Sequence, residues 1–238
     1  MRLNKYIAQA GICSRRKADE LTEAGKVRIN GAVCKQLGYD VQEGDIVEVN
    51  GQTIGKAEKH VYYMLNKPVG YITTNEDEKG RPTATSLLTD VTARVFPVGR
   101  LDANTSGLLI LTNDGEFANK VAHPSHRIEK TYIAVVNDHV SNDALWTLRN
   151  GVDIGGYRTR PAIVNVLANE SHAAKLEVKI SEGKNRQVRR MFEAVGLKVL
   201  QLERIAEGQL QLGRLKPGSY RKLSPAEIEY LSGSKGNR

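Results

Sequence analysis

Residues 99–115 read Gly-Arg-Leu-Asp-Ala-Asn-Thr-Ser-Gly-Leu-Leu-Ile-Leu-Thr-Asn-Asp-Gly and are the most informative stretch of this 238-residue chain. A Gly-Arg step leads to Asp102 on a loop rich in turn-forming residues. The apolar run 108–111 follows as a strand that anchors the loop to a core. Residues 113–115 are turn formers that end this strand. The pattern predicts a rigidly held carboxylate beside Arg100, a side chain suited to an anionic substrate. A second interpretation is that Asp102 is only an Asx-turn residue, and the spacing alone does not decide between the two.

Outward from this stretch, hydrophobic alternation predicts a domain in which strands outnumber helices. Val61, Tyr63 and Leu65 alternate as a strand that ends at Lys67-Pro68. Because several strands are joined by hairpins, we expect an α+β domain over residues 61–232, with a mixed or antiparallel central sheet and peripheral helices. Further strands are expected at 130–136, 162–167, 176–180 and 199–202, and helices at 116–123, 145–152, 186–195 and 225–231. The small, polar residues 233–238 are expected to form a flexible tail.

Residues 1–55 predict a smaller α+β unit of two helices followed by twisted hairpins. Ser14 is expected to cap a second helix over 15–24. The dipeptides Asn30-Gly31 and Asn50-Gly51 are strong signals for tight hairpin turns. Residues 56–60 are polar and short, which is typical of a linker to the domain that follows.

Positive charge is concentrated in two stretches that lie far apart in the sequence. The formal net charge is +8; residues 1–35 hold eight Lys and Arg against three acidic residues, and residues 181–222 hold ten against four. We expect two surfaces that follow one polyanionic backbone. Because only 5% of the residues are aromatic, binding would rest on phosphate contacts and shape rather than on stacked rings.

The composition disfavours several classes of protein. No run approaches the ~20 apolar residues that a membrane span needs, and no apolar signal core follows the first residues, so a cytoplasmic protein without a membrane partner is expected. Cys13 and Cys34 form no CxxC pair and have no histidine cluster at zinc-ligand spacing, which indicates two reduced thiols. The sequence also lacks a glycine-rich nucleotide loop and the HExxH motif, so no cofactor and no metal are expected.

Basic residues cluster where the second helix is expected to begin. Arg15, Arg16 and Lys17 lie where the backbone N–H groups of a helix start already favour an anion. Lys26 and Arg28 bracket the entry of the following strand. The two groups together could clamp a phosphate backbone; the alternative is a solvated helix face.

The order of three fragments in this part of the chain adds a resemblance. Residues 3–7 (Leu-Asn-Lys-Tyr-Ile), 14–18 (Ser-Arg-Arg-Lys-Ala) and 25–31 (Gly-Lys-Val-Arg-Ile-Asn-Gly) together resemble the S4-type RNA-binding domain over about residues 1–50. The resemblance implies that this unit binds structured RNA.

Four ordered segments resemble the pseudouridine synthases of the RsuA/RluB type, which modify ribosomal RNA. They are residues 99–115, residues 66–70 (Asn-Lys-Pro-Val-Gly) with 80–83 (Gly-Arg-Pro-Thr), residues 130–132 (Lys-Thr-Tyr) and residues 182–191 (Glu-Gly-Lys-Asn-Arg-Gln-Val-Arg-Arg-Met). The match spans nearly the whole chain after the linker, and it implies an isomerase that converts a uridine of ribosomal RNA to pseudouridine.

The resemblance also implies roles for individual residues. The catalytic aspartate of the family falls on Asp102, its active-site tyrosine on Tyr132, and the basic partner of the aspartate on Arg189. A carboxylate suits attack on the sugar or stabilisation of its developing charge, although attack on the base and elimination to a glycal remain open routes. Tyr132 could pack against the turned base and assist removal of the C5 proton, or it could be a core tyrosine. Arg189 could instead be an exposed helix charge.

Five further cations are candidates for contacts to RNA phosphate or ribose. They are Lys67, Arg81, Arg100, Arg186 and Arg190. For Lys67, Arg81 and Arg100 taken singly, a solvated charge is an equal alternative. Because the target uridine must leave its RNA fold at a cost of a few kcal/mol, backbone contacts would offset the extrusion.

Three other functions each require a feature that can be checked in the sequence. A non-catalytic rRNA-binding assembly protein would be expected to have lost Asp102 or Arg189, and both are present. An RNA methyltransferase would need a glycine-rich loop at a strand end, which the sequence lacks. A hydrolase with paired carboxylates would need Asp102 beside Asp114, but an apolar strand separates them.

The segments 14–21 and 183–196 look closer to the large-subunit, RluB-like branch of the family. We therefore expect a monomer that acts on large-subunit ribosomal RNA, free or in an assembling subunit. Small-subunit RNA is the alternative.

Overall fold

The structure is a computed structural model that describes residues 1–55, 58–75, 77–123, 126 and 128–233. The chain divides into two compact units, Met1–Val61 with Asp90–Val95 and Tyr62–Thr89 with Phe96–Arg238. Positions 56–57 of the expected linker and 234–238 of the expected tail lie outside the described residues.

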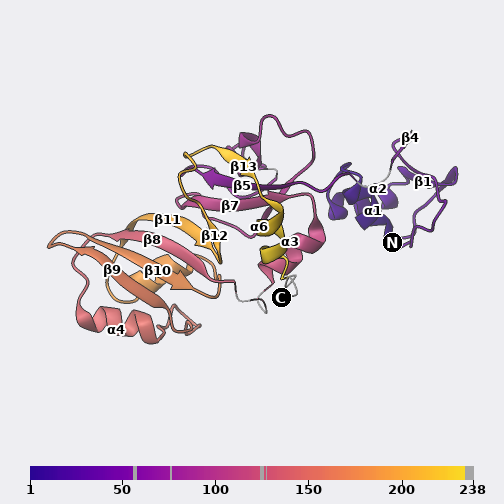
Figure 1. The fold of residues 1–238 in the computed structure, drawn as a ribbon. Coiled ribbons are helices and arrows are strands. Elements are labelled where there is room, and N and C mark those ends of the chain that lie inside the picture. Colours follow the sequence, from indigo (N-terminus) through magenta and orange to yellow (C-terminus); the bar gives the residue numbers. More distant parts are fainter. Residues whose placement is uncertain (56–57, 76, 124–125, 127, 234–238) are drawn as a thin grey trace. The chain divides into compact units, whose positions relative to one another are not determined.

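The first unit packs two helices on a four-stranded antiparallel sheet (Figure 1). Helices α1 (Leu3–Gln9) and α2 (Arg15–Glu23) precede strands β1 (Val27–Ile29), β2 (Ala32–Val33), β3 (Val47–Val49) and β4 (Gln52–Thr53), in the sheet order β2-β1-β3-β4. Leu3 and Ile7 of α1, Ala18 of α2, and Val27 and Val47 of the sheet are buried together as its core. The apolar spacing of the sequence therefore places one face of each helix on the sheet.

Local signals set the ends of these elements. The Ser14 side chain accepts a 3.2 Å hydrogen bond from the backbone N–H of Lys17, so the predicted N-cap of α2 is confirmed. Asn30 and Asn50 have φ of 51° and 52°, and each is followed by a glycine with positive φ. These are the backbone angles of tight hairpin turns, which the two Asn-Gly dipeptides predicted.

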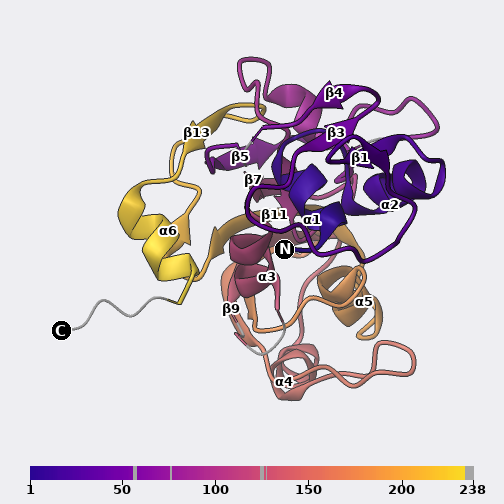
Figure 2. The same cartoon turned by 90° about the vertical axis from the view of Figure 1, so that its right-hand side faces the viewer.

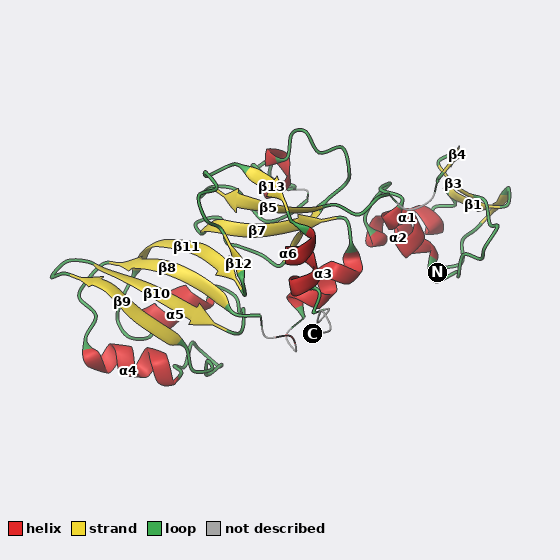
Figure 3. Ribbon diagram, viewed as in Figure 1, coloured by secondary structure: helices red, strands yellow, loops and turns green. Residues whose placement is uncertain are grey.

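The second unit is built on a nine-stranded mixed sheet (Figure 3). The strand order is β13-β5-β7-β11-β8-β10-β9, with β6 paired to β7 and β12 paired to β11. Strands β7 and β11 run parallel, and the other pairs described are antiparallel. A mixed or antiparallel sheet was predicted, and the parallel pair of β7 and β11 makes it a mixed one. The strands are β5 (Tyr62–Lys67), β6 (Phe96–Val98), β7 (Ser106–Thr112), β8 (Lys130–Val136), β9 (Ile163–Asn169), β10 (Ala174–Ile180), β11 (Val199–Glu207), β12 (Leu210–Gln211) and β13 (Tyr220–Lys222).

Two hydrophobic cores lie against the two halves of this sheet. Helices α4 (Asn142–Asn150) and α5 (Gln187–Glu193) bury side chains with β8, β10 and β11, and α4 lies beside β9 (Figure 2). Helices α3 (Gly115–Ala122) and α6 (Pro225–Leu231) pack with β5 and β7. A short 3₁₀ helix, η1 (Ala84–Leu87), completes the unit. The two halves meet where β7 pairs with β11.

The observed elements differ from the predicted ones mainly at their ends. Helix α5 begins at Gln187 rather than at residue 186, because Arg186 adopts a left-handed φ of 50°. Strand β11 continues to Glu207, beyond the apolar run that predicted it. Strands β6, β12 and β13 were not predicted, because each has only two or three residues and forms through pairing with a remote strand.

Candidate active site

The loop that carries Asp102 is fixed at both ends by hydrogen bonds. The Thr105 N–H donates to the Asp102 carbonyl at 3.0 Å, which closes the turn. On the other side, the Thr73 hydroxyl donates to the Leu101 carbonyl at 2.6 Å and lies 3.2 Å from the Leu101 N–H, which donates to it. Strand β7 begins four residues after Asp102, so the carboxylate stands on a short loop anchored in the sheet.

Gly107 allows the start of β7 to lie directly against β11. Its φ is 105°, and a Cβ at this position would lie 2.2 Å from the carbonyl oxygen of Arg204. Only glycine fits both the backbone angle and the space. The glycine that follows Thr105-Ser106 in the sequence motif therefore sets the distance between the Asp102 loop and β11.

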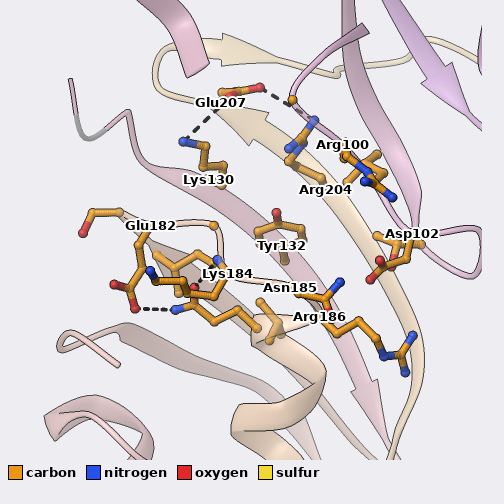
Figure 4. Close-up of a pocket in the computed structure, with 18 of the residues that line it drawn as sticks. Arg100, Asp102, Lys130, Tyr132, Glu182, Lys184, Asn185, Arg186, Arg204 and Glu207 are labelled. Atoms are coloured by element: carbon orange, nitrogen blue, oxygen red, sulfur yellow. Dashed lines mark hydrogen bonds and ion pairs between the residues drawn. The ribbon is translucent and has the colours of Figure 1, made fainter. Parts of the chain in front are cut away.

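Asp102 lies in a cleft with a volume of about 540 Å³ (Figure 4). The walls come from the Asp102 loop, from β8 and β11, and from residues 180–188 between β10 and α5. The volume is in the range of pockets that enclose a small ligand. Four segments remote in sequence thus converge on one carboxylate.

The Asp102 side chain is half-buried and has no hydrogen bond or ion pair with any residue in the described part of the chain. It still acts electrostatically on three groups of the second unit: Lys67, Tyr132 and Arg189. A carboxylate that is held by its backbone, with its oxygens uncommitted, is available to a substrate in the cleft.

Lys67 does not match the expected contact to RNA. It is wholly buried, and its Nζ donates to the carbonyl oxygens of Pro68 and Tyr71 at 2.9 and 2.8 Å. Burial lowers the pKa of Lys67 to about 8, against the opposing effect of the Asp102 charge. With no exposed surface, Lys67 holds the backbone of the turn at residues 68–71 rather than a phosphate or ribose.

Arg189 is a buried residue and not an exposed helix charge. It is 5% exposed, and it donates to the Val199 carbonyl at 3.0 Å through Nη1 and to the Asn104 carbonyl at 2.6 Å through Nη2. Burial lowers the pKa of Arg189, and the charge of Asp102 opposes that change. Among the described residues, Arg189 forms no ion pair with Asp102 within 4.0 Å. It therefore acts on the carboxylate through the field of its charge and through the Asn104 backbone.

Tyr132 faces the cleft from β8 with three charged residues around it, none of which was assigned a role from the sequence. Arg204 lies directly opposite Tyr132 across β8 and β11, and Glu207 lies opposite Lys130. Glu207 pairs with both cations, at 3.8 Å to Arg204 and 3.9 Å to Lys130. Burial raises the pKa of Tyr132, and the charge of Arg204 opposes that rise.

A signal for these three residues was present in the sequence. Lys130, Arg204 and Glu207 are charges within or at the end of apolar strands, where side chains alternate between the two faces of a sheet. A charge in such a place is a functional candidate, but the strand register is needed to show that it faces Tyr132.

The remaining cations predicted for RNA binding in this unit divide into two groups. Arg100 and Arg186 are exposed and line the cleft, and Arg186 reaches the Asn104 side chain at 3.5 Å. Arg81 is exposed but is held by Asp77 at 2.7 Å. Arg190 donates to the carbonyl oxygens of Ile154 and Gly155. Arg100 and Arg186 are therefore the two whose guanidinium groups are best placed for a ligand in the cleft.

The five basic residues of the first unit that were predicted to bind RNA are solvent-exposed. Arg15, Arg16 and Lys17 lie at the start of α2, where Lys17 pairs with Glu20 at 2.9 Å, and Lys26 and Arg28 lie at β1. Exposure is what phosphate contacts require.

Asp114 has a structural role, which argues against a hydrolase that uses Asp102 and Asp114 as paired carboxylates. It caps α3 by accepting hydrogen bonds from the N–H groups of Glu116 and Phe117 at 2.9 and 3.1 Å, and it accepts a 2.8 Å bond from the Tyr62 hydroxyl. Asp114 follows β7 while Asp102 precedes it, so the two carboxylates lie at opposite ends of that strand.

Within the described ranges, no helix is long and apolar enough to cross a membrane. The same residues contain no group of three or more His, Cys, Asp or Glu side chains arranged to hold a metal ion.

Comparison with known proteins agrees with this geometry. Residues 61–194 match the family described as RNA pseudouridylate synthase, and residues 1–47 match the S4 domain. The chain is 44% identical to ribosomal large subunit pseudouridine synthase B of Bacillus subtilis, over 97% of this chain and 95% of the relative. It is 42% identical to an uncharacterized RNA pseudouridine synthase of Aquifex aeolicus, over 97% and 93%.

A solved structure shows the same fold. A crystal structure of a pseudouridylate synthase, 32% identical, superposes with a TM-score of 0.70 over 97% of this chain and 99% of that one. The cleft with its uncommitted carboxylate, the family match and the identity to relatives over nearly their full length lead to one conclusion. The chain belongs to the RNA pseudouridylate synthases, a family of isomerases, and carries an S4 domain at its N-terminus.

Proposed function

We propose that this enzyme converts one uridine of large-subunit ribosomal RNA to pseudouridine, with Asp102 as its catalytic carboxylate. The choice of large-subunit RNA is supported by the 44% identity to a relative that is named for that subunit. The choice of Asp102 is supported by its place in the cleft and by its lack of a hydrogen-bond or ion-pair partner among the described residues.

The chemistry requires a group that acts at the sugar. The C1′–N1 bond breaks, the uracil turns, C5 bonds to C1′, and the proton on C5 is lost. The ionised Asp102 attacks C1′ or stabilises the positive charge that develops on the ribose. The charge of Arg189 favours this ionised form, and the Asn104 contact of Arg189 supports the direction of the loop.

Tyr132 is assigned to the base. It is half-buried on the cleft side of β8, where a flipped uracil could pack on its ring. Its hydroxyl is assigned to removal of the C5 proton in the last step.

The rest of the chain is assigned to RNA binding. Arg100 and Arg186 contact phosphates next to the flipped uridine, since both are exposed and line the cleft. The domain over residues 1–55 adds backbone contacts through Arg15, Arg16 and its other exposed cations. A monomer holds both surfaces, joined by the linker at 56–60, with the catalytic domain over 61–232.

The experiment is release of tritium from C5-labelled uridine in transcripts of large- and small-subunit RNA. Wild-type protein is expected to release tritium from the large-subunit transcript. Asp102→Asn is expected to reduce release at least about 1,000-fold while RNA affinity stays within about threefold, because the change removes charge and keeps size. Asp143→Asn, which changes an exposed carboxylate on α4, is the matched control and should leave release unchanged.

The alternatives give different results. Release from the small-subunit transcript alone would correct the substrate. Release from neither transcript but from an assembling particle would make the particle the substrate. RNA binding without release from any of these would indicate a non-catalytic assembly protein.

A further inference from the structure

Two charged side chains are buried beside Tyr132 without an evident structural reason. Arg204 and Glu207 are each 4% exposed, and they are paired at 3.8 Å. Glu207 also pairs with the half-buried Lys130 at 3.9 Å. Removing charges from water costs free energy that a loose ion pair does not fully return. Stability therefore does not explain the cluster.

Arg204 is almost fully enclosed by the protein at the wall of the cleft. Its Nη2 is enclosed and forms no hydrogen bond to any described residue. Its Nε donates to the Leu108 carbonyl of β7 at 2.8 Å. The β8–β11 register places Tyr132 directly opposite Arg204, and Figure 4 shows the two side chains next to each other at the wall of the cleft.

We propose that Arg204 is a positioning residue for the isomerisation, which holds the phenol of Tyr132 toward the cleft from the paired position on β11. This role rests on the proposed function, because it requires that Tyr132 face the uracil. Arg204 is fixed to β7 through Leu108, and β7 continues directly from the Asp102 loop. One side chain therefore connects the strand that follows the carboxylate to the tyrosine.

Four charged groups surround the phenol of Tyr132. Arg204 and Glu207 face it from β11, Lys130 from its own strand, and Asp102 from the loop before β7. The charges of Glu207 and Asp102 oppose ionisation of the phenol, as burial does, and the charge of Arg204 favours it. Changes at Arg204 and at Glu207 should therefore shift the behaviour of Tyr132 in opposite directions.

The step in which this charge takes part is removal of the C5 proton. Tyr132 first gives its own proton to solvent. The C5–H bond then breaks, and the proton passes to the phenolate oxygen. The electron pair of that bond forms the C5–C6 double bond, and the π pair of the C6–N1 double bond moves onto N1. N1 then takes a proton from solvent. The phenol releases its proton to solvent before the next turnover.

A double-mutant cycle on C5 tritium release tests whether Arg204 acts through the phenol. Arg204→Met is expected to lower kcat about tenfold or more when Tyr132 is present. In a Tyr132→Phe background the same change is expected to alter kcat by less than about twofold, since the hydroxyl is already missing. Equal losses in the two backgrounds would overturn the proposal.

The pH profile separates this role from a merely structural one. Arg204→Met is expected to recover part of its lost rate as the pH rises, because a higher pH restores the phenolate. Glu207→Gln is expected to shift the profile toward lower pH, and Arg204→Lys, which keeps the charge, to retain most of kcat. Shifts of Arg204→Met and Glu207→Gln in the same direction would contradict the assignment.

Because Arg204→Met leaves the buried Glu207 carboxylate with only the half-buried Lys130 as a partner, the cycle is repeated in a Glu207→Met protein, where no buried carboxylate is left without Arg204. A measurement that needs no activity completes the test. The difference in ultraviolet titration between each protein and its Tyr132→Phe counterpart gives the pKa of Tyr132 alone. It should rise in Arg204→Met and fall in Glu207→Gln. An unchanged value in Arg204→Met would refute this inference whatever the substrate is, whereas failed tritium release by wild-type protein would refute the proposed function instead.

Discussion

Arg189 reaches from helix α5 to the loop that carries Asp102 and donates a 2.6 Å hydrogen bond to the carbonyl oxygen of Asn104, two residues after Asp102. The same guanidinium donates to Val199 at the start of β11. The guanidinium group of Arg189 thus links helix α5, the Asp102 loop and strand β11. Arg189 thus contacts the Asp102 loop at Asn104 without forming an ion pair with the Asp102 carboxylate.

Arg189→Lys should therefore impair catalysis more than binding. An ammonium group keeps the charge but cannot reproduce the two-pronged contact to Asn104 and Val199. We expect kcat to fall about 100-fold, the scale of a misplaced catalytic group, with the RNA Kd changed less than about threefold. Steady-state kinetics and filter binding measure the two effects. Arg190→Lys is the control, because Arg190 also donates to backbone carbonyls but not in the Asp102 loop. Comparable kcat losses in both variants would show that the Asn104 contact is unimportant.

Gly107→Ala should destabilise the second unit strongly. The new Cβ would meet the Arg204 carbonyl oxygen at 2.2 Å on a residue with φ of 105°. We expect a loss of about 3 kcal/mol in the free energy of unfolding, measured by urea denaturation. Gly115→Ala is the matched control, since Gly115 lies in α3 with open space around its Cα. It should be neutral or slightly stabilising. Equal stability of the two variants would contradict the close approach of β7 and β11.

Glu227 should contribute to stability only above acidic pH. Hydrogen bonds from Arg221, at 2.6 and 2.8 Å, and from the N–H of Ser224, at 2.8 Å, lower the pKa of Glu227 from 4.5 to about 2. Because the pKa is lower in the folded state, the ionised carboxylate stabilises the fold at a pH above 4.5. This stabilisation is lost as the pH falls from 4.5 to about 2.

Glu227→Gln should accordingly cost about 1 kcal/mol at pH 7, the scale of a partly exposed pair with a capping contact. The difference from wild-type protein should shrink as the pH falls below 4.5. Urea denaturation of both proteins across this range is the measurement. A difference that stays constant with pH would mean that the carboxylate charge plays no part.

Arg16→Gln should weaken RNA binding in a salt-dependent way. Arg16 is exposed at the start of α2, and removal of one phosphate contact should reduce the slope of log Kd against log salt by about 0.7 to 1. Lys175→Gln removes an equal charge from an exposed position on β10 and should leave the slope unchanged. Equal slopes for the two variants would place the RNA elsewhere than on the first unit.

The sequence was sufficient where structure is decided locally. The Ser14 cap, the two Asn-Gly turns and the apolar strand after Asp102 each follow from a few adjacent residues. Such features depend on propensities and turn chemistry that act within about ten residues.

The sequence failed where the answer depends on which strands are neighbours. Arg204 and Glu207 belong to the site because β11 pairs with β8 in one particular register. Lys67 looked like a ligand for RNA, but its strand lies inside the sheet and its ammonium group is folded back onto carbonyl oxygens. Charges in an apolar strand mark Arg204 and Glu207 as candidates, but their place beside Tyr132, like the folding back of Lys67, is set by contacts between residues far apart in the chain.

The seam between β7 and β11 has a mechanical consequence. These strands join the two halves of the sheet through two paired positions, Glu203 with Ser106 and Arg204 with Gly107. Asp102 precedes the strand on one side of the seam, and Tyr132 stands on the other side. Two paired positions are few beside the seven that join β8 to β11, so a twist of one half of the sheet against the other would be expected to alter the spacing between the carboxylate and the phenol. An RNA bound to both halves of the sheet would thereby be able to change the spacing between Asp102 and Tyr132.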